Sequence, residues 1–160
     1  MEEEFLQSVN EHQGIIIKVC RMYCSDSTDA EDLFQEILLQ LWKSWPTFHA
    51  TSKVSTWIYR IGLNTAITRL RKNSRRPDLQ ALSFAQDAIG EIPSQRLDIL
   101  FDQELQAAIN ELDKFDRALV MLYLEEKSYK EIGEIMGLSE SNVGVKINRI
   151  KKQLKEKINR

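Results

Sequence analysis

The last 33 residues of the chain, from Ser128 to Arg160, hold a dense set of basic and amide side chains at helical spacing. At about 100° per residue, an apolar stripe of about 80° is formed by Val143, Ile147, Ile150, Leu154 and Ile158. The opposite side holds Ser141, Val145, Asn148, Arg149 and Lys152, and the flanks hold Asn142, Lys146, Lys151 and Lys155. Arginine can donate two hydrogen bonds to guanine, asparagine can pair with adenine, and flanking lysines can neutralise phosphates. This pattern predicts a helix that reads the major groove of DNA, and the alternative is an ordinary solvated helix face.

The residues before this helix have the spacing of a helix-turn-helix. Ser128 and Glu131 have the S-x-x-E form of a capping box, which predicts a helix start. Gly137 can adopt the left-handed conformation that ends a helix, and Ser139 can then cap the next helix. Gly133 lies in mid-helix, where glycine costs about 1 kcal/mol relative to alanine. We therefore expect a second helix to cross closely at Gly133.

The rest of the chain must position this helix, and its apolar spacing is helical throughout, with no useful period-two alternation. We expect one or two helices over Phe5 to Cys24, with an interruption near Gly14. A capping box at Thr28-Asp29-Ala30-Glu31 predicts the next helix, which Pro46 ends. A polar loop from Phe48 to Val54 precedes a helix that begins at Ser55 and runs to Lys72.

Residues Asn73 to Leu97 contain Pro77 and Pro93 and lack a sustained apolar stripe, which is typical of a linker. A short helix over Leu79 to Ala88 is an option within it. Helical spacing resumes from Leu100 to Leu112 and again from Asp113 to Glu126. The predicted fold is all-α, with two small helical domains, 1–76 and 98–160, joined by a flexible linker, 77–97.

Charge is strongly segregated along the chain, although the net charge is only -2. Residues 37–76 contain eight basic residues and no acidic one, residues 78–126 contain eleven acids against three bases, and residues 141–160 contain seven bases against one acid. Two basic patches therefore flank an acidic middle. Local patches are what a phosphate backbone meets, so the near-neutral total does not argue against nucleic acid as a partner.

The sequence indicates a protein without a metal, cofactor or membrane segment. Cys20 and Cys24 could share a helix face with His12 nearby, but no further ligands complete a tetrahedral site, so buried reduced thiols are favoured. No apolar run reaches the roughly 18 residues of a membrane span, and the acidic N-terminus differs from a signal peptide. We expect a cytoplasmic protein. Neither a nucleophile with a base nor a carboxylate cluster indicates an enzyme such as a nuclease.

Three segments together resemble the extracytoplasmic-function (ECF) class of RNA polymerase sigma factors, in the sigma-70 family. Residues 29–36, DAEDLFQE, are similar to the core-polymerase-binding motif of sigma region 2. Residues 55–66, STWIYRIGLNTA, are similar to the helix that melts the promoter and recognises the minus-ten element. Residues 128–154 are similar to the region 4 helix-turn-helix that binds the minus-thirty-five element.

The resemblance implies a sigma factor that binds core RNA polymerase and promoter DNA, as duplex and as melted single strand, with an anti-sigma factor as a candidate further partner. The core-binding residues would be Asp32, Gln35 and Glu36, and the minus-ten residues Phe48, Ile61, Gly62 and Asn64. The minus-thirty-five residues would be Ser141, Asn142, Val145, Lys146, Asn148, Arg149, Lys151 and Lys152.

The chain departs from the class at three positions: Gly144 stands where a lysine or arginine is more common, Asn142 where a threonine is common, and Thr68 where an aspartate is frequent. These departures bear on promoter sequence rather than on class. The main alternative is a stand-alone helix-turn-helix regulator whose N-terminal domain senses a ligand or dimerises.

Overall fold

The computed structural model describes residues 2–48, 52–75 and 103–159, and within them all regular structure is helical. The all-α prediction is confirmed. The chain divides into two compact units, Met1–Ile92 (unit 1) and Pro93–Arg160 (unit 2). The predicted linker, 77–97, its optional helix and the expected helical start at Leu100 lie outside the described residues.

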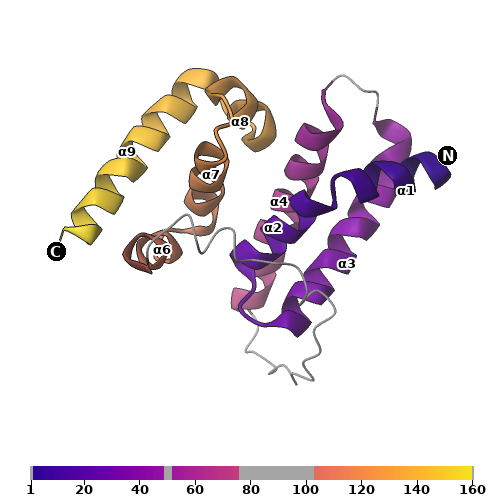
Figure 1. Cartoon of the computed structure of the whole chain (residues 1–160), viewed down its shortest axis with the longest axis horizontal. Helices are drawn as coiled ribbons and strands as arrows, with labels where there is room; N and C mark the ends of the chain where they lie inside the picture. The colour runs from indigo at the N-terminus through magenta and orange to yellow at the C-terminus, as the bar shows by residue number, and fades with distance from the viewer. Residues whose placement is uncertain (1, 49–51, 76–102, 160) are drawn as a thin grey trace. The chain divides into compact units, whose positions relative to one another are not determined.

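Unit 1 is built on three packed helices, α2 (Gln13–Tyr23), α3 (Ser27–Ser44) and α4 (Val54–Arg75) (Figure 1). Their shared core includes Ile16, Leu33, Ile37, Ile58 and Leu63, each at most 1% exposed. Helix α1 (Glu2–Glu11) adds its buried Phe5 and Val9, and a 3₁₀ turn, Trp45–Thr47, follows α3. Burial of these side chains is the main stabilising term for a unit of this size.

Two helix boundaries in unit 1 differ from the prediction. The break between α1 and α2 lies at His12 rather than near Gly14, which is inside α2. Helix α3 begins at Ser27 because Asp26 is its N-cap: the Asp26 carboxylate accepts a 2.7 Å hydrogen bond from the Asp29 N–H. The predicted start of this helix at the Thr28 capping box was therefore wrong, because the carboxylate of Asp26, two residues earlier, caps the helix.

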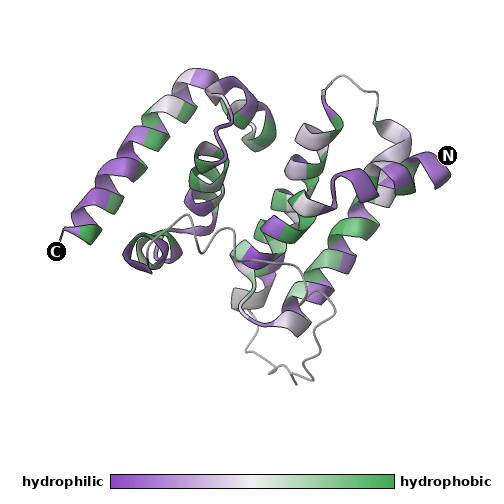
Figure 2. Cartoon of the chain, viewed as in Figure 1, coloured by the Kyte–Doolittle hydropathy of each residue, from purple (hydrophilic) through white to green (hydrophobic). Residues whose placement is uncertain are grey.

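Unit 2 contains α6 (Gln103–Asn110), α7 (Lys114–Leu124), α8 (Tyr129–Met136) and α9 (Glu140–Ile158). Helix α9 packs on α6, α7 and α8 through a stripe that Figure 2 shows as hydrophobic bands along an otherwise hydrophilic helix. The stripe consists of Val143, Ile147, Ile150 and Leu154, all buried as predicted. Ile158 is 36% exposed and does not belong to it.

The predicted helix-turn-helix capping is confirmed in detail. The Ser128 hydroxyl accepts from the Glu131 N–H at 3.1 Å, and the Glu131 carboxylate accepts from the Ser128 N–H at 3.2 Å. Gly137 has φ 73°, the left-handed conformation that ends α8. The Ser139 hydroxyl then accepts from the Asn142 N–H at 3.1 Å and begins α9.

Gly133 has a different neighbour from the one expected. Its carbonyl accepts from the N–H groups of Gly137 and Leu138, at 2.8 and 3.0 Å, so the turn folds back onto α8. A Cβ atom at Gly133 would collide with the Leu138 carbonyl oxygen. The close approach is made by the backbone of the turn itself, not by the crossing of a second helix.

This close approach predicts that Gly133→Ala lowers the free energy of unfolding of unit 2 by about 1 to 3 kcal/mol, because the new methyl group displaces the turn. Gly14→Ala is the matched control. A Cβ at Gly14 meets nothing within 4 Å, so alanine there should stabilise α2 by up to about 1 kcal/mol. Urea unfolding followed by circular dichroism reports both units, and fluorescence reports unit 1, which holds all three tryptophans. Equal stability of Gly133→Ala and the parent would contradict the prediction.

Candidate nucleic-acid and protein interfaces

The outward face of α9 is exposed along most of its length. Seven of the eight predicted DNA-contacting residues are exposed, and Lys146 is half-buried; the exposed ones are Ser141, Asn142, Val145, Asn148, Arg149, Lys151 and Lys152. Val145 is 65% exposed, so its apolar side chain has no role in the core. The first turn of α9 presents backbone N–H groups and the positive end of the helix dipole, which favour a phosphate. This face combines hydrogen-bonding, apolar and cationic groups in the way that base readout requires.

The two predicted phosphate-contacting lysines on the flanks of α9 lie over aromatic rings of α7. The Lys151 ammonium is 4.5 Å from the ring centroid of Tyr123, and the Lys146 ammonium is 5.9 Å from that of Phe115. Lys146 and Arg149 also act electrostatically on Asp116, where they partly counter the rise in pKa that burial and Asp113 cause. The structure therefore links these cations to α7 in the free protein.

Predicted core-binding residues occupy one exposed side of α3. Asp32 and Gln35 are exposed, whereas Glu36 is turned toward Arg69 of α4 with a 3.7 Å separation between charged atoms. Arg69 also pairs with Asp29 at 2.7 Å and is itself 19% exposed. Asp32 and Gln35 are available to a partner as they stand. The Glu36 carboxylate already interacts with Arg69 and so takes part in the contact between α3 and α4.

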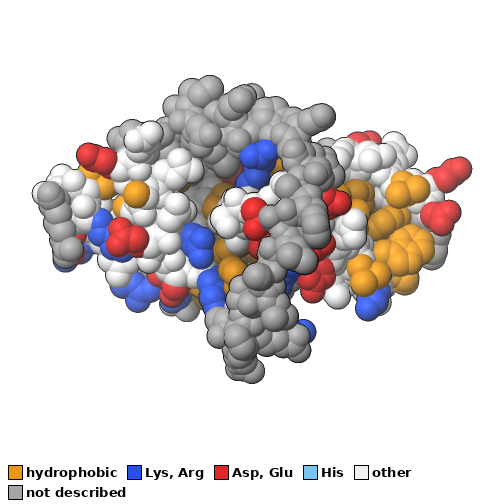
Figure 3. Space-filling view, turned by 90° about the horizontal axis from the view of Figure 1, so that it is seen from below, with side chains coloured by type: hydrophobic (Ala, Val, Ile, Leu, Met, Phe, Trp, Pro, Cys, Tyr) orange, Lys and Arg blue, Asp and Glu red, His pale blue; other side chains and the backbone are white. Residues whose placement is uncertain are grey.

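An apolar surface that the sequence analysis missed continues the same side of α3. Leu39 is 49% exposed and Trp42 44%, and Leu6 of α1 is 52% exposed. Figure 3 shows hydrophobic side chains gathered with acidic ones at the N-terminal end of unit 1. The contact of Trp42 with Phe5, edge to face at 5.0 Å, covers only part of the Trp42 ring. The spacing of Gln35, Leu39 and Trp42 on one helix side was the signal that could have revealed this surface.

The predicted minus-ten residues differ in how far they are exposed to solvent. Phe48 is half-buried between Trp45 and Trp57, with ring centroids at 5.8 and 4.8 Å. Gly62 is buried, and a Cβ atom there would contact Val19 and Ile37 at 3.8 and 3.9 Å. Gly62, predicted as a minus-ten contact, therefore lies in the core of unit 1 where α4 packs on α2 and α3.

The remaining minus-ten candidates, Ile61 and Asn64, lie one helical turn apart on α4, and Asn64 is exposed. The loop expected beside them falls in part outside the described residues, because His49 to Thr51 are not among them. Asn64 is the most exposed residue of this set, whereas Ile61 and Phe48 are half-buried.

The two cysteines are in an environment that keeps their thiols protonated. Burial raises the pKa of Cys20 to about 12, and burial followed by the charge and hydrogen bond of Asp29 raises the pKa of Cys24. Among the described residues, no group of three His, Cys, Asp or Glu side chains is placed to hold a metal ion. Nor does any helix among them have the length and hydropathy to cross a membrane.

Comparison with known proteins assigns both units to one family. Residues 9–76 match Sigma-70 region 2, and residues 102–154 match Sigma-70 region 4. The chain belongs to the sigma-70 family of RNA polymerase sigma factors, in its ECF class. Its relatives include the Bacillus subtilis ECF sigma factor SigM, 30% identical over 82% of this chain and 80% of that protein. The ECF sigma factor SigW of the same organism is 27% identical over 98% of this chain and 90% of the length of SigW.

Solved structures agree on the fold. The chain resembles the sigma factor RpoE, solved in complex with the anti-sigma factor NepR from Bartonella quintana, with a TM-score of 0.70, 19% identity and 98% coverage of both chains. It also resembles CnrH, solved in complex with the cytosolic domain of CnrY, with a TM-score of 0.68, 22% identity and coverage of 99% and 90%. The two-region helical architecture is thus that of known sigma factors.

The raised pKa values predict that Cys20 and Cys24 react slowly with a thiol reagent such as dithionitrobenzoate at pH 8, since the thiolate is the reactive form. Raising the pH from 7 to 9 should leave the rate far below that of a free cysteine, and unfolding in urea should restore it. Time-resolved absorbance measures this directly. Rapid reaction of either thiol in the folded protein at pH 8 would show that the burial argument fails.

Proposed function

We propose that the chain is a transcription initiation subunit that binds core RNA polymerase, recognises two promoter elements and helps to open the duplex. The observation that carries the proposal is the exposed outward face of α9, held by a fully capped helix-turn-helix, in a chain that also contains sigma region 2. Residues 1–76 would serve core binding and minus-ten recognition, and residues 98–160 minus-thirty-five recognition. The protein would have no catalytic activity of its own and would act in the cytoplasm with the polymerase.

Core polymerase would bind the exposed side of α3. Asp32 and Gln35 offer an acid and an amide, and Leu39 and Trp42 offer apolar area further along the same side. Tryptophan is enriched among residues that dominate binding energy, whereas exposed charges contribute mainly to orientation and association rate. The partner surface should therefore carry basic or amide groups next to an apolar stretch.

Promoter DNA would meet both units. On α9, Arg149 and Asn148 would read base edges, Val145 would contact an apolar base group, and Lys146, Lys151 and Lys152 would contact phosphates. On α4, Asn64 and Ile61 would contact a base of the melted minus-ten element by an edge hydrogen bond and by apolar contact. Phe48 would support this surface through its stack with Trp45 and its tilted contact with Trp57.

An anti-sigma factor is part of the proposal. RpoE and CnrH, whose folds this chain shares, are described in complexes with NepR and with the cytosolic domain of CnrY. A partner that covers the exposed side of α3 would exclude polymerase by occupying the same residues. The apolar surface of Leu6, Leu39 and Trp42 suits such a competitor as well as the polymerase.

The proposal is tested by run-off transcription with purified core polymerase on a library of genomic fragments. We expect discrete transcripts that depend on both the chain and core enzyme, from fragments that share two elements. Tight sequence-specific binding by the chain alone, with no transcripts when core enzyme is added, would instead favour the stand-alone regulator.

The α3 surface predicts that Asp32→Lys weakens binding to core enzyme, by roughly tenfold, because a charge-reversed residue meets the partner's complementary group. Thermal stability should change little, since Asp32 is exposed. Glu11→Lys is the matched control: it makes the same change in net charge at another exposed site of unit 1, on a different side of α1 from Leu6, and should leave affinity near the parental value. Fluorescence anisotropy with labelled chain measures both. Equal affinities for the two variants would remove α3 from the interface.

A further inference from the structure

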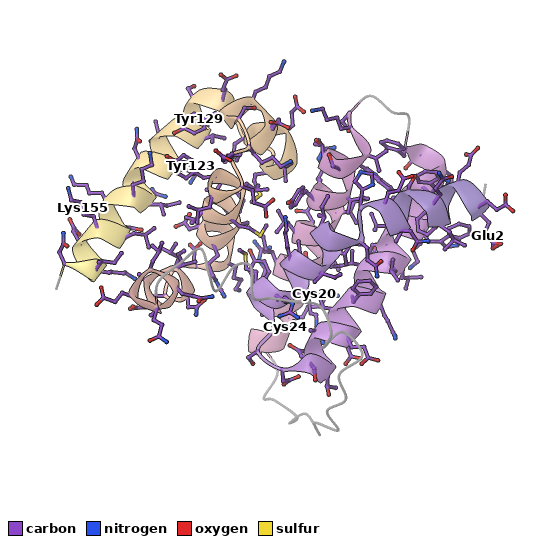
Figure 4. All side chains as sticks on the ribbon, viewed as in Figure 1. Glu2, Cys20, Cys24, Tyr123, Tyr129 and Lys155 are labelled. Atoms are coloured by element: carbon purple, nitrogen blue, oxygen red, sulfur yellow. The ribbon has the colours of Figure 1, made fainter. Side chains whose placement is uncertain are left out.

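Four residues from three helices meet on one flank of α9. Tyr123 comes from α7, Tyr129 from α8, and Gly144 and Lys151 from α9, where they are two turns apart. Figure 4 labels both tyrosines, which lie where α7 and α8 approach α9, and labels Lys155 one turn beyond Lys151. The site lies beside the outward face of α9 rather than under its buried stripe.

The ring of Tyr129 covers Gly144. A Cβ atom at Gly144 would be 3.4 Å from Cε2 of Tyr129, an ordinary van der Waals distance, so the Tyr129 ring lies close over the α9 backbone at this position. Tyr123 lies next to Tyr129, with ring centroids 6.5 Å apart at an angle of 40°. The two rings thus form a supported pair at the edge of the helix-turn-helix.

The Lys151 ammonium lies at this pair, 4.5 Å from the Tyr123 ring centroid. A hydrogen bond with the Tyr123 side chain raises the pKa of Lys151, so the interaction favours the charged form. An ammonium has three N–H donors, and one neighbour leaves the others for a further acceptor. A lysine side chain in solution samples many rotamers, and holding it in one place before binding reduces the entropy lost on binding.

We propose that Tyr123 is a positioning residue that holds Lys151 at the edge of α9 for a DNA backbone phosphate, with Tyr129 packed over Gly144 as the support of the Tyr123 ring. The inference rests on the proposed function, because it assumes that α9 lies in the major groove. It assigns a DNA-binding role to α7, a helix that contributes none of the predicted DNA contacts. The contact is with the backbone, so it adds affinity without base preference.

The test is a double-mutant cycle on holoenzyme bound to a promoter fragment identified by run-off transcription. Tyr123→Leu removes the ring and the hydroxyl, and should weaken binding about two- to fivefold, the size expected for an exposed cation–π contact. The factor should be the same for every single-base variant of the promoter. The dependence of affinity on salt should fall toward that of Lys151→Gln, by up to about one unit of slope.

The cycle separates positioning from a structural role. In the Lys151→Gln background, Tyr123→Leu should have almost no further effect, whereas in the Lys155→Gln background its effect should persist in full. Lys155 is the matched control because it is exposed on the same flank one turn further along α9. If Tyr123→Leu proves unfolded by circular dichroism, the same cycle is run with Tyr123→Phe, which keeps the ring. A smaller loss that again disappears with Lys151→Gln is then expected.

A loss of affinity that survives in the Lys151→Gln background, a base-specific loss, or no loss with either substitution would overturn the inference while the proposed function stands. Failure of the parental holoenzyme to bind any promoter fragment would overturn the proposed function and this inference together.

Discussion

The contact between Gly133 and the backbone of Leu138 is the constraint on which unit 2 depends. Two N–H groups of the turn, those of Gly137 and Leu138, converge on the Gly133 carbonyl, and the Leu138 carbonyl occupies the space where a side chain would be. The turn is therefore short and rigid, and it fixes where α9 begins. From that point the buried stripe determines the rotation of α9, and hence which residues face outward.

Unit 1 has a corresponding link in Arg69. It joins α4, which carries the proposed minus-ten residues, to Asp29 and Glu36 on α3, which carries the proposed polymerase surface. Arg69 is 19% exposed, and its short pairing with Asp29 fixes how α4 lies against α3. Because ion pairs near the surface contribute little to stability, the main effect of Arg69 is on the arrangement of the two helices. The two binding surfaces of unit 1 are thus attached to one rigid pair of helices.

Most features with local causes could be predicted from the sequence, the start of α3 excepted, and features with distant causes could not. The capping box at Ser128 and the left-handed Gly137 depend on residues within one turn, and both are confirmed. Periodicity also identified the buried face of α9. Gly62 has no side chain, so the hydrophobic pattern of the sequence does not indicate which side of α4 it lies on. Only the packing of α2 and α3 against α4 shows that Gly62 is buried. The surroundings of Phe48 likewise depend on aromatic residues brought together by the fold.

The separation between the two sides of α9 has a consequence for how relatives of this chain diverge. The outward residues from Ser141 to Lys152 are exposed and are not part of the buried stripe, and substitutions at such positions usually change stability by less than about 0.5 kcal/mol. Under the proposed role of this face, mutations there alter which promoter is read without a loss of folding that selection would remove. Duplicated copies of such a gene can therefore acquire separate sets of promoters by changes in a few exposed codons, while the stripe and the turn glycines stay under constraint.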